Sequence, residues 1–103
     1  MSIITEIVNL KTISGITDEE FIEIVNGLEC EFHTKQEGFM NSELVKGNET
    51  DNWMIIQHWK SKEEASLASK KMFEEKTTER FRNALDPQNV KIMLLPQIKI
   101  WKP

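Results

Sequence analysis

The segment from Trp53 to Trp59, WMIIQHW, constrains the fold most, because it has the pattern of a β-strand with apolar residues on both faces. Alternate side chains of a strand point to opposite faces of the sheet. One face carries Trp53, Ile55, Gln57 and Trp59, and the other carries Met54, Ile56 and His58. A sheet with one face in water alternates more cleanly between apolar and polar residues. We therefore expect this strand to belong to a sheet that is covered on both sides.

Two helix starts are marked by the Ser/Thr-x-x-Glu spacing of a capping box, Thr17 with Glu20 and Ser61 with Glu64. Apolar residues at helical spacing follow both starts. They are Phe21, Ile24, Val25, Leu28 and Phe32 after the first, and Ala65, Ala68, Met72, Phe73, Phe81, Ala84 and Leu85 after the second. The polar residues 74–76 interrupt the second stripe and predict a break near Ser69 and Lys70.

Three more segments have strand character, at residues 3–10, 39–45 and 90–101. Pro96 lies within the last one and demands an edge position or a bulge there. The predicted order is strand, helix, strand, strand, helix, strand. This is the ferredoxin-like βαββαβ arrangement, an α+β fold. The 103 residues fit a single domain that spans 1–103.

The predicted helices cover only one face of the four-stranded sheet. Trp53, Trp59 and Trp101 all fall in predicted strands, and leaving such side chains in water would create a large exposed apolar patch. A second copy of the chain is the simplest cover for the other face. We therefore expect a homodimer that packs sheet against sheet as a dimeric α/β barrel.

Charge and composition exclude several classes of function. The net charge is −4, and no basic stripe that would neutralise phosphates is present, so nucleic-acid binding is not expected. No apolar run is long enough to span a bilayer and no secretion signal opens the chain, which favours a soluble, cytoplasmic protein without a membrane partner. Cys30 is the single cysteine, and no cluster has zinc-ligand spacing, so neither a disulfide nor a metal site is predicted.

The stretch from Trp53 to Phe81, WMIIQHWKSKEEASLASKKMFEEKTTERF, resembles the antibiotic-biosynthesis monooxygenases and their haem-degrading relatives. The distinctive part is an apolar strand that ends in Trp59 and runs directly into Lys60-Ser61-Lys62-Glu63-Glu64-Ala65, with Phe73 and Phe81 further on. The order and spacing of the other elements agree along nearly the whole chain. The resemblance implies a dimeric α/β barrel of the ferredoxin-like type. It also implies a planar aromatic bound between helices and sheet and reacted with oxygen, in many members without a separate cofactor, and none is predicted here.

The haem-degrading branch of this family uses an asparagine in the first strand, a tryptophan in the second helix and a histidine further along that helix. Asn9 matches the asparagine. The place of the tryptophan falls near Ala68, and that of the histidine near Thr77 or Thr78. Haem degradation by that mechanism is therefore not expected.

Five residues are candidates for the site. Asn9 is polar within an apolar strand and is suited to orient a substrate carbonyl or enolate by hydrogen bonding, and His58 is a candidate for proton transfer. Trp53, Trp59 and Phe73 are candidates for binding a flat ligand. Each has a structural alternative. For Asn9 it is an amide satisfied by neighbouring backbone, for His58 a hydrogen-bonded structural histidine, and for the aromatic rings core or dimer packing.

Two functions follow from these residues. The first is a monooxygenase-like enzyme that oxidises a small planar aromatic of the quinol type with molecular oxygen. The alternative is a non-catalytic ligand-binding or stress-related dimeric α/β-barrel protein, which the absence of the family's helix histidines and tryptophan favours.

Overall fold

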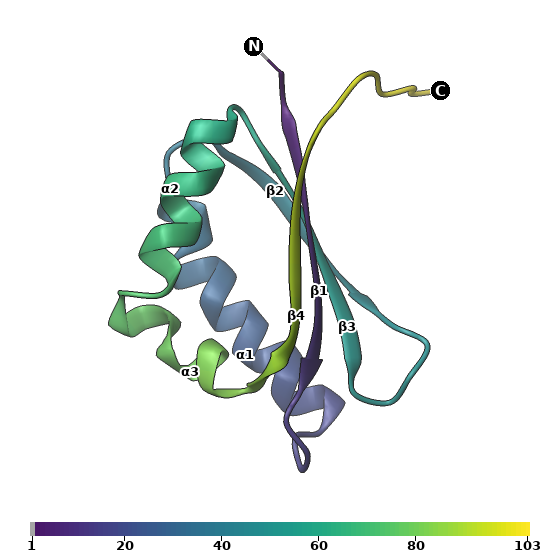
Figure 1. Ribbon diagram of the computed structural model, residues 1–103, viewed down its shortest axis with the longest axis vertical. Coiled ribbons are helices and arrows are strands. Elements are labelled where there is room, and N and C mark those ends of the chain that lie inside the picture. The colour runs from purple at the N-terminus through teal and green to yellow at the C-terminus, as the bar shows by residue number, and fades with distance from the viewer. Residues whose placement is uncertain (1) are drawn as a thin grey trace.

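The computed structural model describes residues 2–103, and its elements follow the predicted order (Figure 1). The strands are β1 (Ile4–Thr12), β2 (Phe39–Lys46), β3 (Asn52–Trp59) and β4 (Leu85–Pro96). The helices are α1 (Asp18–Glu31), α2 (Lys62–Met72) and α3 (Glu79–Asn83), with short 3₁₀ turns at His33–Lys35 and Lys76–Thr78. The α+β, ferredoxin-like class expected from the sequence is confirmed.

The four strands form one antiparallel sheet in the order β2-β3-β1-β4. β1 lies at the centre of this order and pairs with both of its neighbours. Ile4 lies opposite Trp59 on β3 and opposite Pro96 on β4. Figure 1 shows α1, α2 and α3 on one side of the sheet, with no helix or strand of residues 2–103 on the other side. The structure is thus two layers, with the helices over a single face.

Both predicted helix starts are present with their capping contacts. The Glu20 backbone N–H donates to the Thr17 hydroxyl at 3.1 Å, and the Glu20 carboxylate accepts from the Thr17 N–H at 3.3 Å. At α2 the Glu64 N–H donates to the Ser61 hydroxyl at 3.1 Å. These bonds satisfy backbone donors that have no partner within the first turn of a helix.

The core lies between the helices and the sheet face that carries Trp53 and Trp59. Phe21 of α1 packs on Trp53, with ring centroids 5.0 Å apart, and on Phe81 of α3 at 6.1 Å. A smaller cluster joins Trp59 to Ile4 and to Ala65 and Ala68 of α2. The two alanines allow α2 to lie close to the indole, because they add little side-chain volume between helix and sheet.

The second helical region breaks later than predicted, after Met72 rather than near Ser69 and Lys70. Thr78 explains where the chain turns. Its side chain is fully buried, and its hydroxyl donates to the carbonyl of Met72 and lies 2.9 Å from the carbonyl of Glu75. The hydroxyl therefore bonds to a carbonyl at the end of α2, where the last carbonyls have no partner within the helix.

The last strand ends at Pro96, so the prediction of a strand continuing to Trp101 is wrong. Pro96 pairs with Ile4 at the end of β1, and the following Gln97 N–H donates to the Ile3 carbonyl at 2.8 Å. β1 itself begins at Ile4, so the paired part of β4 ends here. Ile98, Ile100 and Trp101 consequently lie in a tail and are 90%, 59% and 78% exposed.

The uncovered sheet face mixes apolar and polar side chains, and its apolar residues differ from those expected. Trp53 and Trp59 point toward the helices and are 5% and 0% exposed, so neither contributes to the uncovered face. That face instead carries apolar side chains from the alternate positions of each strand. They are Ile7 of β1, Val45 of β2, Met54 and Ile56 of β3, and Met93 and Leu95 of β4.

None of the helices within residues 2–103 combines the length and the apolar composition needed to cross a membrane.

Candidate functional site

A cavity of about 510 Å³ lies between the covered face of the sheet and the helices. Its size falls in the usual range for sites that bind small molecules. Strands β1, β3 and β4 form its floor, and residues of all three helices form its roof. Most lining side chains are apolar, among them Val8, Leu28, Ile55, Met72, Phe81, Leu85, Val90 and Ile92.

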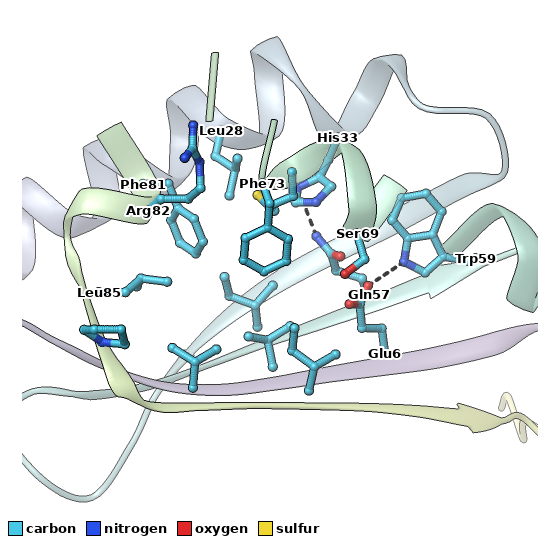
Figure 2. A pocket seen from close by; sticks show the side chains of 16 residues that line it. Glu6, Leu28, His33, Gln57, Trp59, Ser69, Phe73, Phe81, Arg82 and Leu85 are labelled. Carbon is cyan, nitrogen blue, oxygen red and sulfur yellow. Dashed lines mark hydrogen bonds between the residues drawn. The ribbon is translucent and has the colours of Figure 1, made fainter. Parts of the chain in front are cut away.

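Most polar groups of the cavity gather at one end, and Arg82 lies at the other. Figure 2 shows Glu6, Gln57, Ser69, Trp59 and His33 together at that end, with Phe81 and Leu85 at the other and Phe73 between. The arrangement follows from strand alternation, because Glu6 and Val8 share one face of β1, while Ile55, Gln57 and Trp59 share one face of β3. The cavity therefore has a polar end and an apolar body.

Glu6 is a buried carboxylate, 5% exposed, on an otherwise apolar strand face. One of its oxygens accepts a hydrogen bond from the indole N–H of Trp59 at 2.9 Å. No other residue in the range 2–103 donates a hydrogen bond to this carboxylate at normal distance. Burial raises the pKa of Glu6 above its ordinary value; the Trp59 bond and the charge of His33 offset part of this rise, and the charge of Glu29 adds to it. Glu6 is thus a stronger base than a glutamate in water.

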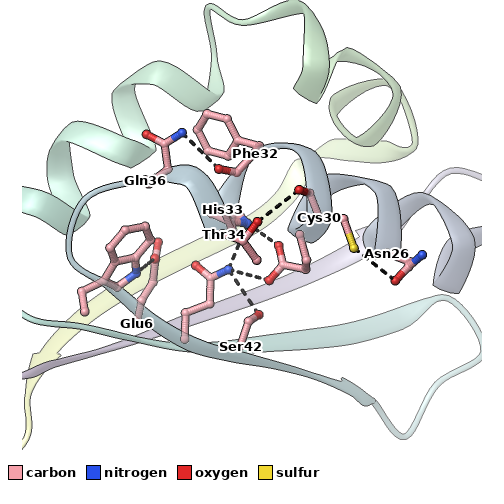
Figure 3. Close-up of polar contacts among 11 residues, drawn as sticks. Glu6, Asn26, Cys30, Phe32, His33, Thr34, Gln36 and Ser42 are labelled. Carbon is pink, nitrogen blue, oxygen red and sulfur yellow. Dashed lines mark hydrogen bonds and ion pairs between the residues drawn. The ribbon is translucent and has the colours of Figure 1, made fainter.

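A second buried polar cluster lies beside Glu6 and is shown in Figure 3. Glu29 of α1 pairs with Nδ1 of His33 and accepts from the Gln57 amide at 3.1 Å. The same amide nitrogen lies 3.2 Å from Nδ1 of His33 and 3.3 Å from the Ser42 hydroxyl. Burial alone would raise the pKa of Glu29, but bonds from His33, Ser42 and Gln57 and the His33 charge outweigh it and lower that pKa. Glu29 therefore stays ionised and holds His33 and Gln57 in place.

Aromatic rings surround His33 and shape this end of the cavity. The imidazole stacks on Phe39 at 5.9 Å between ring centroids and meets Trp59 edge-on at 6.1 Å. His33 is 4% exposed. The ring is therefore fixed in orientation by packing as well as by Glu29.

The opposite end of the cavity is closed by residues of α3 and of β4. Arg82 lines this end, and its guanidinium donates to the Thr78 hydroxyl at 3.1 Å and to the Glu75 carbonyl at 2.9 Å. Phe73 also lines the cavity but is 64% exposed. Its ring therefore marks where the cavity meets solvent.

Two of the three aromatic residues predicted for ligand binding line this cavity, namely Trp59 and Phe73. Trp53 does not line it. Its ring packs against Phe21, and Lys46 Nζ lies over the ring, 4.2 Å from its centroid. The structure thus places Trp53 in the core near the far end of β3.

Asn9 and His58 lie on the uncovered face of the sheet, away from this cavity. The Asn9 side-chain oxygen accepts from the Asn52 amide at 3.2 Å, and Nδ1 of His58 lies 2.8 Å from the Asn41 side-chain oxygen. Within residues 2–103 neither side chain lines the cavity, because their positions on β1 and β3 alternate with the inward-facing ones. Their catalytic roles stay predictions.

Glu6, Gln57 and His33 are not among the residues that the sequence predicts for the site. A signal for the first two was present. Glu6 shares its strand face with Ile4, Val8 and Leu10, and Gln57 lies between Ile55 and Trp59 on one face. A polar side chain inside an apolar stripe needs a buried partner, and a cavity is one place where such partners converge.

No group of three or more histidine, cysteine, aspartate or glutamate side chains within residues 2–103 comes together in a way that would hold a metal ion.

The fold and cavity place the chain in the class of ferredoxin-like α+β proteins with a ligand-sized pocket under the helices. Solved structures with this fold include SnoaB, a cofactor-independent oxygenase from Streptomyces nogalater, at 13% identity and a TM-score of 0.72, with 97% of each chain covered. A Bordetella bronchiseptica protein named as a candidate antibiotic biosynthesis monooxygenase matches at 11% identity and a TM-score of 0.78, over 96% of this chain and 100% of the other. PA3566 from Pseudomonas aeruginosa matches at 16% identity and a TM-score of 0.68, over 96% of this chain and 97% of the other.

The resemblance to antibiotic-biosynthesis monooxygenases expected from the sequence is therefore confirmed at the level of the fold. No sequence model of a known protein family matches this chain, and no curated protein matches it in sequence.

Proposed function

We propose that this protein is a monooxygenase-like enzyme that oxidises a small planar aromatic of the quinol type with molecular oxygen. The observation that carries the proposal is the largely apolar cavity of about 510 Å³ with most of its hydrogen-bonding groups at one end. A flat hydroxylated ring system matches this distribution, with its rings against the apolar walls and a hydroxyl toward Glu6, Gln57 and Ser69. The likeness in fold to a cofactor-independent oxygenase supports the same class of reaction.

A quinol supplies all the electrons that such a reaction requires. For 1,4-dihydroxynaphthalene, C10H8O2 and O2 give 2-hydroxy-1,4-naphthoquinone, C10H6O3, and H2O. One oxygen atom enters the ring and the other leaves as water, so no external reductant is needed. The protein would contribute positioning of the ring, exclusion of bulk water and proton transfer at the hydroxyl.

The test is oxygen uptake by the purified protein with 1,4-dihydroxynaphthalene, followed by mass analysis of the product formed under ¹⁸O2. The proposal predicts 2-hydroxy-1,4-naphthoquinone carrying one ¹⁸O atom. Spontaneous oxidation of the quinol instead gives unsubstituted naphthoquinone and hydrogen peroxide. A product mixture identical to that of a protein-free control would contradict the proposal.

Two serines of α2 provide a matched control for the location of the reaction. Ser69 lines the cavity, whereas Ser66 on the same helix is exposed to solvent. Ser69→Phe places a ring in the polar end of the cavity and is expected to abolish both turnover and binding of the quinol. Ser66→Phe is expected to leave both within about twofold, since a surface change away from a site has little effect. Tight binding of the quinol without turnover would support the alternative of a non-catalytic ligand-binding protein.

We also propose that the protein is a homodimer that packs through the uncovered sheet face. Apolar side chains from all four strands lie on that face, and Val45, Met93 and Leu95 are 37%, 36% and 43% exposed in the single chain. Removing apolar surface from water stabilises association by about 25 cal/mol per Å² before the costs of binding are counted. In this arrangement Asn9 and His58 would lie at the contact between the two sheets.

A further inference from the structure

We propose that Glu6 is the catalytic base of the cavity and accepts the hydroxyl proton of a flat hydroxyaromatic ligand bound there. The inference rests on the proposed function for the class of ligand. It adds the residue that binds the hydroxyl and receives its proton.

The position of Glu6 is the first argument. Its carboxylate lies at the polar end of the cavity, where Figure 2 shows it beside Gln57 and Ser69 and bonded to Trp59. A ligand whose rings lie against Val8 and Ile92 on the floor of the cavity would direct a terminal hydroxyl at this end. The Trp59 N–H holds one carboxylate oxygen at 2.9 Å and leaves the carboxylate free to accept a second hydrogen bond from that ligand.

The neighbouring ionisable groups are less suited to the same role. Glu29 pairs with His33 and accepts from Gln57, and it does not line the cavity. His33 lines the cavity, but its Nδ1 is taken by Glu29 and its ring is held between Phe39 and Trp59. Arg82 lies at the opposite end and is bonded to Thr78 and Glu75. Of the two buried carboxylates, Glu6 is therefore the one that lines the cavity and has capacity to accept a proton from the ligand.

The surroundings of Glu6 favour the transfer. A carboxylate that is 5% exposed has lost most of its hydration, so its protonated form is favoured relative to water. The step moves one proton: the ligand O–H bond breaks, a carboxyl O–H bond forms on Glu6, and the negative charge passes to the ligand oxygen. There the aromatic ring delocalises the charge, and the electron-rich ring is the form that reacts with oxygen.

The experiment uses 2-naphthol, which becomes a strong acid when it absorbs light and then emits differently as the neutral and the ionised molecule. In an apolar cavity it releases its proton only if an acceptor is in contact with the hydroxyl. Excited at wavelengths beyond tryptophan absorption, the wild-type complex is expected to emit mainly from the naphtholate at neutral pH. Glu6→Gln keeps an oxygen for the Trp59 bond but removes the base, and its complex is expected to emit mainly from neutral naphthol.

Three further variants and one assay complete the test. Glu6→Asp keeps a carboxylate and is expected to restore part of the naphtholate emission, and Glu23→Gln, an exposed change on α1, is expected to match wild type. Ser69→Phe is expected to bind no naphthol. In the quinol oxygenation assay, Glu6→Gln is expected to lower turnover by about 10²–10⁴-fold, the usual contribution of a general base.

The outcomes separate this inference from the proposed function. Naphtholate emission that is equal in wild type and Glu6→Gln would overturn the role of Glu6 while leaving the oxygenase proposal to its own assay. Naphthol that binds the wild type but emits only in its neutral form would likewise overturn the role of Glu6 and leave the oxygenase proposal to its own assay. Absence of naphthol binding would overturn both, because the class of ligand would then be wrong.

Discussion

The indole N–H of Trp59 donates to the carboxylate of Glu6 at 2.9 Å, and both side chains are buried on the sheet face beneath the helices. The two residues come from neighbouring strands, since Glu6 lies opposite Gln57, two positions before Trp59. They are 53 residues apart in the chain. The bond therefore links the two central strands of the sheet at the polar end of the cavity.

Replacing Trp59 with phenylalanine is expected to lower the free energy of unfolding by about 2–4 kcal/mol, since it leaves a small cavity and removes the donor to a buried carboxylate. The same change in a Glu6→Gln background is expected to cost less, because an amide tolerates the loss of its partner better than a charge does. A double-mutant cycle by urea unfolding measures the difference, expected at about 0.5–3 kcal/mol. Equal costs in the two backgrounds would show that the bond contributes nothing to stability.

Glu6→Gln is expected to raise the stability of the protein at neutral pH. The pKa of Glu6 is raised in the folded state, so the ionised carboxylate opposes folding there. Below the folded pKa the carboxyl is protonated and this cost disappears. The advantage of the variant should therefore shrink as the pH falls through the raised folded pKa toward the ordinary value of 4.5. Urea unfolding of both proteins across this range measures it, and an advantage that grows on acidification would contradict the burial argument.

Two glycines are expected to respond oppositely to alanine. Gly38 has φ +83°, and a Cβ there would lie 2.5 Å from the Glu64 carboxyl group, so Gly38→Ala should destabilise by about 1–3 kcal/mol. Gly27 lies within α1 with open space at its Cβ position, so Gly27→Ala should stabilise by about 0.5–1 kcal/mol. Thermal melts of the two variants are the measurement. A stabilised Gly38→Ala would show that the turn before β2 does not require a left-handed residue.

The proposed homodimer predicts that a charge on the uncovered sheet face separates the protomers. Ile56→Lys places an ammonium group on that face, whereas Ile22→Lys places one on α1, where Ile22 is already 51% exposed. Sedimentation at micromolar concentration should give twice the chain mass for wild type and for Ile22→Lys, and the mass of one chain for Ile56→Lys. A wild type that sediments as one chain, or an Ile56→Lys variant that stays dimeric, would contradict the proposed interface.

The sequence predicts the architecture well because its signals are local. The capping residues Thr17 and Ser61 start the helices where expected, and the alternation through β3 correctly separates its two faces. Pro96 is also a local signal of a disturbed strand, but whether it interrupts or ends the strand depends on the neighbouring strand. Because Pro96 pairs with Ile4, the first residue of β1, the proline marks the end of the strand rather than an interruption.

The site was less predictable, because it depends on which face of β1 meets the helices. Both faces of that strand mix apolar and polar residues, with Glu6 on one and Asn9 on the other. A shift of one residue exchanges the faces of a strand, so composition alone does not decide between them. His33 lies in the 3₁₀ turn after α1 and meets Gln57 of β3 only through tertiary packing, which a local sequence pattern does not predict.

The central claim is that ligand binds beneath the helices, with its hydroxyl at Glu6, and a crystal structure of the protein with 2-naphthol tests it most directly. The account predicts the rings between Val8, Ile92 and Phe81, with the hydroxyl oxygen within hydrogen-bonding distance of the Glu6 carboxylate. Naphthol bound instead on the uncovered sheet face beside Asn9 and His58, or in the cavity with its hydroxyl turned toward Arg82, would contradict the account.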